Sequence, residues 1–289
     1  MKFLVFGEII WDLYPNQACI GGAPFNFAAY AAGAGVETSL LSAVGRDSLG
    51  DRALEYVREY GVRTDLLLRS SRPTGNCRVT LSESGVPTYD LAEETAYDAI
   101  SVGPEVTEPS FDLLYFGTLA QRSRENAAEL RKLLSAGNCR EIFCDLNLRA
   151  PFYTEESVRL CLSRGTMVKI SREELAETVR LGLDRRLSEP EEAVRALAAA
   201  YPNLKIIAVT LDRDGAMALE VKTGQIFYRG PEPVKVVSTV GAGDSFSAAF
   251  AVSILRGASV EKALDAGVFL SSRVVAAPEA ILRPVPRFW

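Results

Sequence analysis

The sequence contains no histidine. This absence excludes nucleophilic catalysis of the Ser-His-Asp and Cys-His kinds, and it argues against a catalytic zinc site of the usual composition. The five cysteines show no Cys-x-x-Cys spacing and their number is odd, so a disulfide scaffold is not expected in a chain of 289 residues. Any catalysis is left to carboxylates, lysine, arginine, hydroxyl groups and backbone amides.

Long apolar runs and an excess of basic residues are also absent. No run reaches the length that spans a membrane, and the net charge of −5 lacks the basic footprint of a nucleic-acid-binding protein. The N-terminal residues, Met1–Val5, lead directly into a strand pattern. We therefore expect a cytoplasmic protein that binds neither nucleic acid nor a membrane.

A glycine-containing turn in the last quarter of the chain carries the strongest chemical signal. The stretch Ser238–Phe250 reads S-T-V-G-A-G-D-S-F-S-A-A-F. The β-branched run Val234–Val237 before it predicts a buried strand, and the apolar residues of Phe246–Ile254 recur at helical spacing. The predicted first turn of this helix contains Gly241, Ala242, Gly243 and Asp244.

Small residues at a helix start leave backbone N–H groups uncovered. These groups and the positive end of the helix dipole make a site for an anion such as phosphate. Asp244, beside that site, could take a proton from a nucleophile that attacks the anion, which suits phosphoryl transfer. The alternative is a glycine turn in which Asp244 only caps the helix.

Polar residues also follow the first predicted strand, Phe3–Phe6. Asp12 lies just beyond it, and ligands of parallel sheets bind at the carboxyl ends of strands. In Gly21–Asn26 the glycines allow close backbone approach and Pro24 suits a first helical turn. The amide of Asn26 then matches a sugar hydroxyl. The alternatives are a solvated turn acid at Asp12 and an ordinary helix start.

Strand and helix patterns alternate through most of the chain, without a linker, repeat or low-complexity tract. This alternation predicts an α/β fold with a mostly parallel central sheet and helices on both faces. One segment interrupts it, because Cys77–Leu81 alternates apolar and polar residues and Thr88–Leu91 follows a turn. That pattern predicts a β-hairpin. It suits a lid over a site or a dimer contact, or it is a plain edge hairpin.

Several motifs stand in one order along the whole chain. They are Gly21-Gly22-Ala23-Pro24-Phe25-Asn26, Val44-Gly45-Arg46-Asp47-Ser48-Leu49-Gly50, Pro73-Thr74-Gly75 and Gly241-Ala242-Gly243-Asp244. Together they resemble the ribokinase-like (PfkB) sugar kinases, and the first motif with Ala96-Tyr97-Asp98 looks most like the bacterial fructokinase branch. The resemblance implies a three-layer ribokinase-like sandwich, one domain over residues 1–289. It also implies a discontinuous β lid, about 12–22 and 74–98, through which such proteins often form a homodimer.

The resemblance implies ATP-dependent phosphorylation of a sugar hydroxyl, with Asp244 as the base. The amides implied to form the anion hole for the phosphoryl group are those of Gly241, Ala242, Gly243 and Asp244. The residues implied to hold the sugar are Asp12, Gly22, Asn26 and Arg149. The residues implied to lie along the nucleotide are Asp145, Asn147, Ser171, Thr210, Asp212, Gly215, Gly243 and Gly267. Glu174 would help to hold Mg²⁺ through water, although Ser171 and Glu174 also have the spacing of a capping box.

This chain departs from the family pattern on the nucleotide side. Ser238 stands where the family usually has an Asp that is associated with a monovalent-cation site, which puts potassium activation in question. Asp212 replaces a glycine near the phosphates, and Gly267 stands where Asn is common. Glu279 stands within a usual Pro-Gly-Ala. The motifs on the sugar side match the family.

The first hypothesis is thus a kinase that acts on fructose. Other acceptors within this class are 2-keto-3-deoxygluconate, ribose and a nucleoside. A keto-acid would need a positive contact for its carboxylate, from Arg149 or Arg78. A hypothesis of another class is a sugar-binding or regulatory protein on the kinase scaffold. A nicotinamide-dependent dehydrogenase is disfavoured, because the first strand ends in Gly7-Glu8-Ile9-Ile10 instead of G-x-G-x-x-G.

Overall fold

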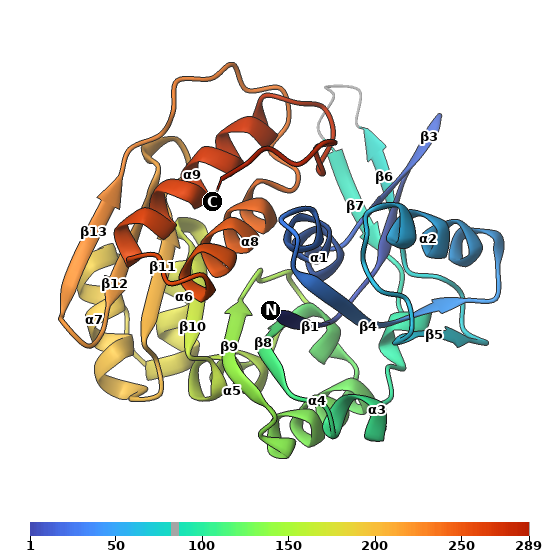
Figure 1. Cartoon of the computed structure of the whole chain (residues 1–289), viewed down its shortest axis with the longest axis horizontal. Coiled ribbons are helices and arrows are strands. Elements are labelled where there is room, and N and C mark those ends of the chain that lie inside the picture. The colour runs from blue at the N-terminus through green and yellow to red at the C-terminus, as the bar shows by residue number, and fades with distance from the viewer. Residues whose placement is uncertain (82–86, 289) are drawn as a thin grey trace.

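Strands and helices alternate along the chain and build a nine-stranded sheet that has helices on both faces (Figure 1). The structure is a computed structural model that describes residues 1–81 and 87–288, with side chains except at 81 and 87–89. The α/β class with a mostly parallel central sheet, predicted from the alternation, is confirmed.

The central sheet is parallel over most of its width. Its strands from β11 to β5 are parallel neighbours, whereas β12 and β13 are antiparallel at one edge. From edge to edge the strands are β13 (Gln225–Arg229), β12 (Ala216–Glu220), β11 (Ile206–Thr210), β10 (Met167–Ser171), β9 (Cys139–Asp145), β8 (Phe111–Gly117), β1 (Lys2–Phe6), β4 (Glu37–Gly45) and β5 (Leu67–Ser70).

Both faces of this sheet are covered by helices. One face packs against α1 (Ala23–Gly33), α2 (Ser48–Glu59), α8 (Ala242–Leu255) and α9 (Val260–Val275). The other packs against α3 (Pro104–Thr107), α4 (Arg124–Ala136), α5 (Glu155–Arg164), α6 (Arg172–Leu183) and α7 (Pro190–Ala200). Side chains alternate between the two cores along β1, because Phe3 and Val5 join the first cluster and Leu4 and Phe6 the second. The short 3₁₀ helices are η1 (Ala96–Asp98), η2 (Leu119–Arg122) and η3 (Asp212–Asp214).

A smaller four-stranded sheet lies beside the central one, at the upper right of Figure 1. Its order is β3 (Gln17–Gly21), β2 (Ile10–Tyr14), β6 (Asn76–Leu81) and β7 (Pro87–Leu91). Strands β6 and β7 pair in an antiparallel register, as the alternating pattern predicted. The sequence around their turn, residues 82–86, lies outside the described residues. The parallel pairing of β2 with β6 joins the two distant segments.

The strand predicted over Val234–Val237 is wrong. This run is irregular, and the side chains of Val236 and Val237 are 61% and 55% exposed. The amides of Val237 and Ser238 both donate to the carbonyl of Val275, at the end of α9, at 2.7 and 3.2 Å. Within the described residues β13 already forms the sheet edge and no strand pairs with the valine run. A β-branched run without a partner strand does not form a strand on propensity alone.

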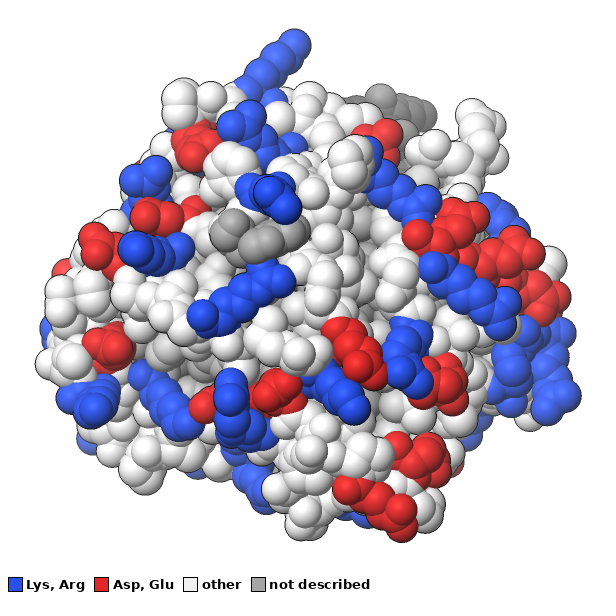
Figure 2. All heavy atoms as spheres, viewed as in Figure 1, with Lys and Arg blue, Asp and Glu red and all other residues white. Residues whose placement is uncertain are grey.

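Charges are interspersed on the surface. Figure 2 shows basic and acidic side chains mixed over the face that carries α9. Exposed ion pairs such as Arg229–Asp265 (3.3 Å) and Arg283–Glu59 (3.2 Å) contribute little stability each. None of the helices in the described part of the chain has the length and apolar character needed to cross a membrane.

Candidate active site

The N-termini of α1 and α8 meet above the carboxyl ends of the central strands. Asn26, in the first turn of α1, donates a hydrogen bond from Nδ2 to Oδ2 of Asp244, in the first turn of α8, at 2.7 Å. Asn26 is only 3% exposed, and its Oδ1 is buried without a hydrogen-bond partner among the described residues. Buried polar atoms are normally paired, so this oxygen is suited to a donor from a ligand.

The turn before α8 has the geometry of an anion site. Gly241 caps the helix in the left-handed conformation, with φ of 79°, and a Cβ there would lie 2.6 Å from the carbonyl of Ala280. Within the described chain, the amides of Gly241, Gly243 and Asp244 donate to no other group. Three free N–H groups and the positive end of a 14-residue helix therefore face the same space as the carboxylate of Asp244.

The start of α1 needs a glycine for a similar reason. Gly22 has φ of 106°, and a Cβ there would lie 2.6 Å from the carbonyl of Glu8. The amide of Asn26 donates to the carbonyl of Gly22 at 2.9 Å, which begins the helix. The helix start predicted from Gly21–Asn26 is thus correct, with Pro24 in the first turn, and it begins at Ala23. Backbone contact between Gly22 and Glu8 fixes where Asn26 lies.

Asp12 lies on one face of the four-stranded sheet. It pairs directly with Cys19 on β3 and Cys77 on β6, so these three side chains share a face. Burial raises the pKa of Asp12, and the nearby charge of Arg149 opposes this. Arg78 pairs with the neighbour of Asp12 and therefore points to the opposite face. Of the two arginines considered for a ligand carboxylate, the structure brings Arg149 beside Asp12.

Glu8 is a buried acid that the sequence did not single out. It lies two residues beyond the end of β1 and is 3% exposed. Its pKa is raised to about 7, chiefly by burial and also by the charge of Asp244, while a backbone hydrogen bond, Arg149 and Arg122 oppose the rise. Glu8 thus lies in the electrostatic environment of Asp244 and Arg149. Its only signal in the sequence is an acid at the carboxyl end of an apolar strand.

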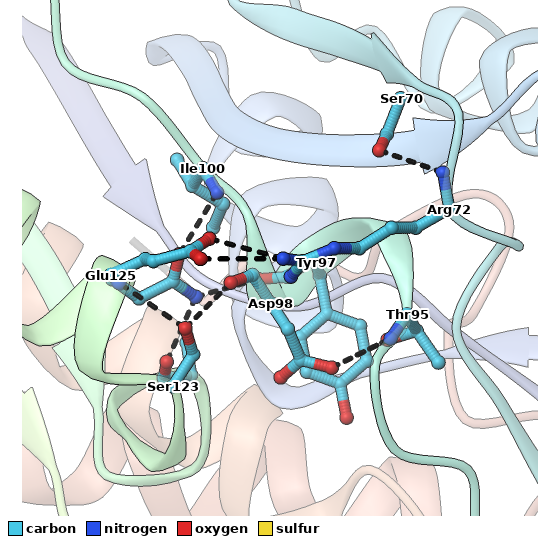
Figure 3. Close-up of polar contacts among 10 residues, drawn as sticks. Ser70, Arg72, Thr95, Tyr97, Asp98, Ile100, Ser123 and Glu125 are labelled. Carbon is cyan, nitrogen blue, oxygen red and sulfur yellow. Dashed lines mark hydrogen bonds and ion pairs between the residues drawn. The ribbon is translucent and has the colours of Figure 1, made fainter.

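The segment Ala96–Asp98, which follows β7, is held by a capping box. The Asp98 carboxylate accepts from the backbone N–H of Thr95 at 2.9 Å, and the Asp98 carbonyl accepts from Ser123 Oγ at 2.6 Å (Figure 3). These bonds attach the end of the four-stranded sheet to the start of α4.

Arg122 extends this cluster toward Glu8. It forms a buried ion pair with Asp98 at 2.7 Å, and its guanidinium lies over the rings of Tyr97 and Phe152 at 4.8 and 4.9 Å. Nη1 of Arg122 and the hydroxyl of Tyr97 are buried without a hydrogen-bond partner among the described residues. Since the charge of Arg122 lowers the pKa of Glu8, this cluster lies near Glu8.

Asp145 lies at the end of β9, fully buried, below the turn before α8. One carboxylate oxygen accepts from Lys169 Nζ at 3.2 Å and the other from Ser247 Oγ at 2.7 Å. Burial raises the pKa of Asp145 to about 6; Lys169 opposes the rise, and the charges of Asp244 and Glu174 add to it. Lys169 was missed in the sequence because it stands inside the apolar strand Met167–Ser171.

The capping box predicted from Ser171 and Glu174 is present at the start of α6. Oε2 of Glu174 accepts from the backbone N–H of Ser171 at 2.8 Å, and Oε1 accepts from that of Leu148 at 2.7 Å. Ser171 pairs in register with Thr210 at the ends of β10 and β11. Glu174 and Asp145 are near enough for the charge of Glu174 to raise the pKa of Asp145.

The remaining residues that the sequence predicts along a nucleotide lie at turns or in packing contacts. Asn147 and Asp212 have positive φ, 40° and 52°, and Asp212 is exposed. Asparagine and aspartate tolerate this conformation, which explains how an acid can occupy a usual glycine position. A Cβ on Gly215 would lie 2.0 Å from the carbonyl of Arg229. Gly267 packs against the ring of Phe246, where a Cβ would lie 2.6 Å away, so it permits close packing of α8 and α9.

The close contact at Gly22 gives a first prediction. We expect Gly22→Ala to lower the free energy of unfolding by about 3 kcal/mol or more, because the conformation is strained and the Cβ overlaps Glu8. Gly35→Ala is the matched control, since Gly35 has φ of 81° with no atom within 4 Å of its Cβ position. Urea unfolding of both variants is the measurement. Equal losses would mean that the Glu8 contact is unimportant.

The buried carboxyl of Glu8 gives a second prediction. Its pKa in the folded chain is about 7, above the ordinary value of 4.5. Between pH 4.5 and 7 the carboxyl group therefore keeps its proton in the folded chain but loses it in the unfolded chain. The stability of the wild-type protein should therefore fall, by about 3 kcal/mol from this group, as pH rises from 4.5 to 7.

Glu8→Gln should remove this part of the pH dependence. Urea unfolding at several pH values would measure it, with Glu59→Gln, at an exposed glutamate, as the control. An unchanged slope in Glu8→Gln would assign the dependence to other groups, such as Asp145.

The chain is similar to several carbohydrate kinases. The chain is 30% identical over 271 residues to the 5-dehydro-2-deoxygluconokinase of Shouchella clausii (strain KSM-K16), over 89% of this chain and 80% of that protein. The 2-dehydro-3-deoxygluconokinase of Thermotoga maritima has the same fold, with a TM-score of 0.83, 21% identity, and coverage of 98% of this chain and 96% of that one. A fructokinase of Vibrio cholerae O395, with fructose, ADP and calcium ion bound, has a TM-score of 0.82, 17% identity, and coverage of 98% and 95%.

The chain also matches a family model over most of its length. The model of the pfkB family carbohydrate kinases matches residues 15–287. The chain therefore belongs to the pfkB family of carbohydrate kinases.

Proposed function

We propose that this sugar kinase transfers the γ-phosphoryl group of ATP to a hydroxyl group of a small neutral sugar, with fructose as the first candidate. The observation that carries the proposal is the 2.7 Å hydrogen bond between Asn26 and Asp244. It joins the helix start suited to a sugar hydroxyl with the acid that stands beside the free amides.

In this proposal Asp244 is the general base. The acceptor oxygen forms a bond to the γ-phosphorus while the bond to the bridging oxygen breaks, and its electron pair leaves with ADP. The hydroxyl proton goes to Asp244. The free amides of Gly241, Gly243 and Asp244 stabilise the charge on the phosphoryl oxygens. The amide of Ala242 donates to the carbonyl of Thr239 at 3.3 Å and would leave that partner to join them. Asp12, Gly22 and Asn26 orient the acceptor.

Along the nucleotide we propose Asp145, Asn147, Ser171, Thr210, Asp212, Gly215, Gly243 and Gly267, of which Gly267 contributes by packing. Magnesium would neutralise charge on the phosphates. Among the described residues no group of three or more possible ligands forms a metal cage. Mg²⁺ that arrives on the nucleotide keeps several waters and needs only one or two carboxylates. The carboxylate of Glu174, whose oxygens each accept one backbone N–H, retains acceptor capacity for such waters.

Charge favours a neutral acceptor over an acid. Two carboxylates, Asp12 and Asp244, flank the proposed sugar position with Glu8, whose pKa of about 7 leaves it partly ionised at neutral pH. Arg122 is already paired with Asp98. The second candidate is a sugar acid, as in the names of several relatives. One observation favours the sugar acid. Among the described residues no carboxylate lies within ion-pair distance of the exposed side chain of Arg149, so its guanidinium can pair with a carboxylate of the acceptor.

Further parts of the proposal concern assembly and ions. The chain would act as one domain over 1–289, with the four-stranded sheet as a lid that also forms a homodimer contact in the cytoplasm. Ser238 accepts from the backbone N–H of Val240 at 3.3 Å and so serves the local turn. We propose that the enzyme does not depend on potassium, because a hydroxyl replaces the usual carboxylate there.

Replacing the base tests the mechanism. We expect Asp244→Asn to lower kcat by about 10²–10⁴, because the acceptor proton loses its base, while the affinity for a non-hydrolysable ATP analogue stays within about threefold. Coupled assay and calorimetry would measure the two effects. Asp51→Asn is a matched control, since Asp51 also lies in the first turn of a helix, α2. Unchanged turnover in Asp244→Asn would remove Asp244 from the mechanism, and sugar binding without turnover in the wild type would favour a non-catalytic protein.

A panel of acceptors tests the substrate. With fructose as substrate, Arg149→Gln should change KM by less than about tenfold, because no ion pair is lost. With a sugar acid as substrate, KM should rise by about 10²-fold, since a charge-assisted contact disappears. Arg78→Gln, on the opposite face of the sheet, is the control. Turnover of 2-keto-3-deoxygluconate well above that of fructose, together with the large effect of Arg149→Gln, would replace the first candidate with the second.

A further inference from the structure

Lys169 is a lysine in the interior of the protein. It stands on β10, in the sequence Met-Val-Lys-Ile-Ser, and is 5% exposed. Lysine is almost never fully buried unless it is paired. Within the described residues, Lys169 makes one hydrogen bond, from Nζ to Oδ1 of Asp145 at 3.2 Å. Because an ammonium group has three donors, two remain for another acceptor.

The ammonium group lies against the first turn of α8. A Cβ on Gly243 would lie 3.1 Å from Lys169 Nζ, closer than an ordinary contact. Because Gly243 has no side chain, the ammonium group of Lys169 can lie beside the helix backbone there. The N-terminal end of a helix carries a partial positive charge, so a cation there is unfavourable for the folded chain alone.

The charge of Lys169 is maintained by its surroundings. Burial lowers its pKa, but the carboxylates of Asp145, Glu174 and Asp244 raise it, and the pKa ends above its ordinary value. Glu174 accepts two backbone N–H groups and Asp244 accepts from Asn26, so both carboxylates have other partners. The cation thus has one direct partner and faces the same turn as the free amides.

We infer that Lys169 acts on the transferring phosphoryl group, by adding a buried positive charge to the anion site at Gly241–Asp244. This inference rests on the proposed function. A helix end, free amides and an ammonium group with two unused donors gather hydrogen-bond donors at one point, where an incoming anion can accept from them. The charge would matter most for the γ-phosphoryl group, and little for the two phosphates that remain in ADP.

The alternative is that Lys169 serves only as the counter-ion of Asp145. The two roles differ in what they discriminate. A counter-ion supports the fold and the position of Asp145, and its loss would change the affinities for ATP and ADP alike. A cation at the γ-phosphoryl position would change the ATP affinity alone.

The experiment measures calorimetric affinities for ADP and for a non-hydrolysable ATP analogue, with Mg²⁺, in Lys169→Met, Lys169→Arg and the wild type. We expect Lys169→Met to weaken the ATP analogue about tenfold and ADP less than about twofold. With the preferred sugar, kcat should fall by about 10²-fold while the sugar KM stays within about threefold. Lys169→Arg should restore most of both losses.

Two further variants keep the result interpretable. The double variant Lys169→Met/Asp145→Asn removes both charges of the buried pair. If Lys169→Met alone does not fold, the ATP-to-ADP affinity ratio of the double variant is compared with that of Asp145→Asn. Lys205→Met, at an exposed lysine paired with Glu141 at 2.7 Å, is the control and should change neither ratio.

An ATP-to-ADP affinity ratio in Lys169→Met equal to that of the wild type overturns the inference, as does a ratio in the double variant equal to that of Asp145→Asn alone. So does full recovery of the ratio on removing Asp145 as well. Failure of the proposed function has a different signature, in which wild-type protein phosphorylates no sugar while the ratio still depends on Lys169.

Discussion

The candidate site depends on the hydrogen bond between Asn26 and Asp244. This bond joins the N-terminal turns of α1 and α8 through two residues that are 218 positions apart in the sequence. Each helix begins directly after a glycine with positive φ. Gly22 lies against the backbone of Glu8, and Gly241 lies against the backbone of Ala280. Since neither position has room for a side chain, backbone packing sets how closely the two N-termini approach. The acid and the amide are therefore held by the scaffold itself.

Buried charge surrounds this contact. Below it, Lys169 and Asp145 form a pair at 3.2 Å, and beside it Glu8 lies 3% exposed with a pKa raised by burial. Removing charges from water costs free energy that pairing repays only in part. Such an arrangement contributes little to stability, which agrees with a site adapted to a ligand that carries its own charge and hydrogen bonds. Charges of both signs lie near one another at each end, since Lys169 meets Asp145 below the turn before α8 and Arg149 lies near Asp12 and Glu8.

Local patterns in the sequence determined the fold class and the positions of the helix starts. Alternating strands and helices specify an α/β sheet, because apolar runs buried on both faces need helices to cover them. Gly241–Asp244 begins a helix as predicted, and Ser171 with Glu174 forms the expected capping box. These features depend on residues within a few positions of one another, which is why they can be predicted without the structure. The roles of the individual residues along the nucleotide and the sugar remain predictions.

Tertiary structure decided which distant side chains meet. Val234–Val237 has strand propensity but no partner strand, so it remains irregular. In the sequence, Lys169 is only a lysine within a strand pattern. In the structure, β9 places Asp145 and α8 places Gly243 beside its ammonium group. The register of β2 with β6 turns Arg78 away from Asp12, a distinction that composition and spacing do not contain. Sequence fixes local geometry through short-range hydrogen bonds and sterics, whereas the charge environment of the site arises only when packing brings remote segments together.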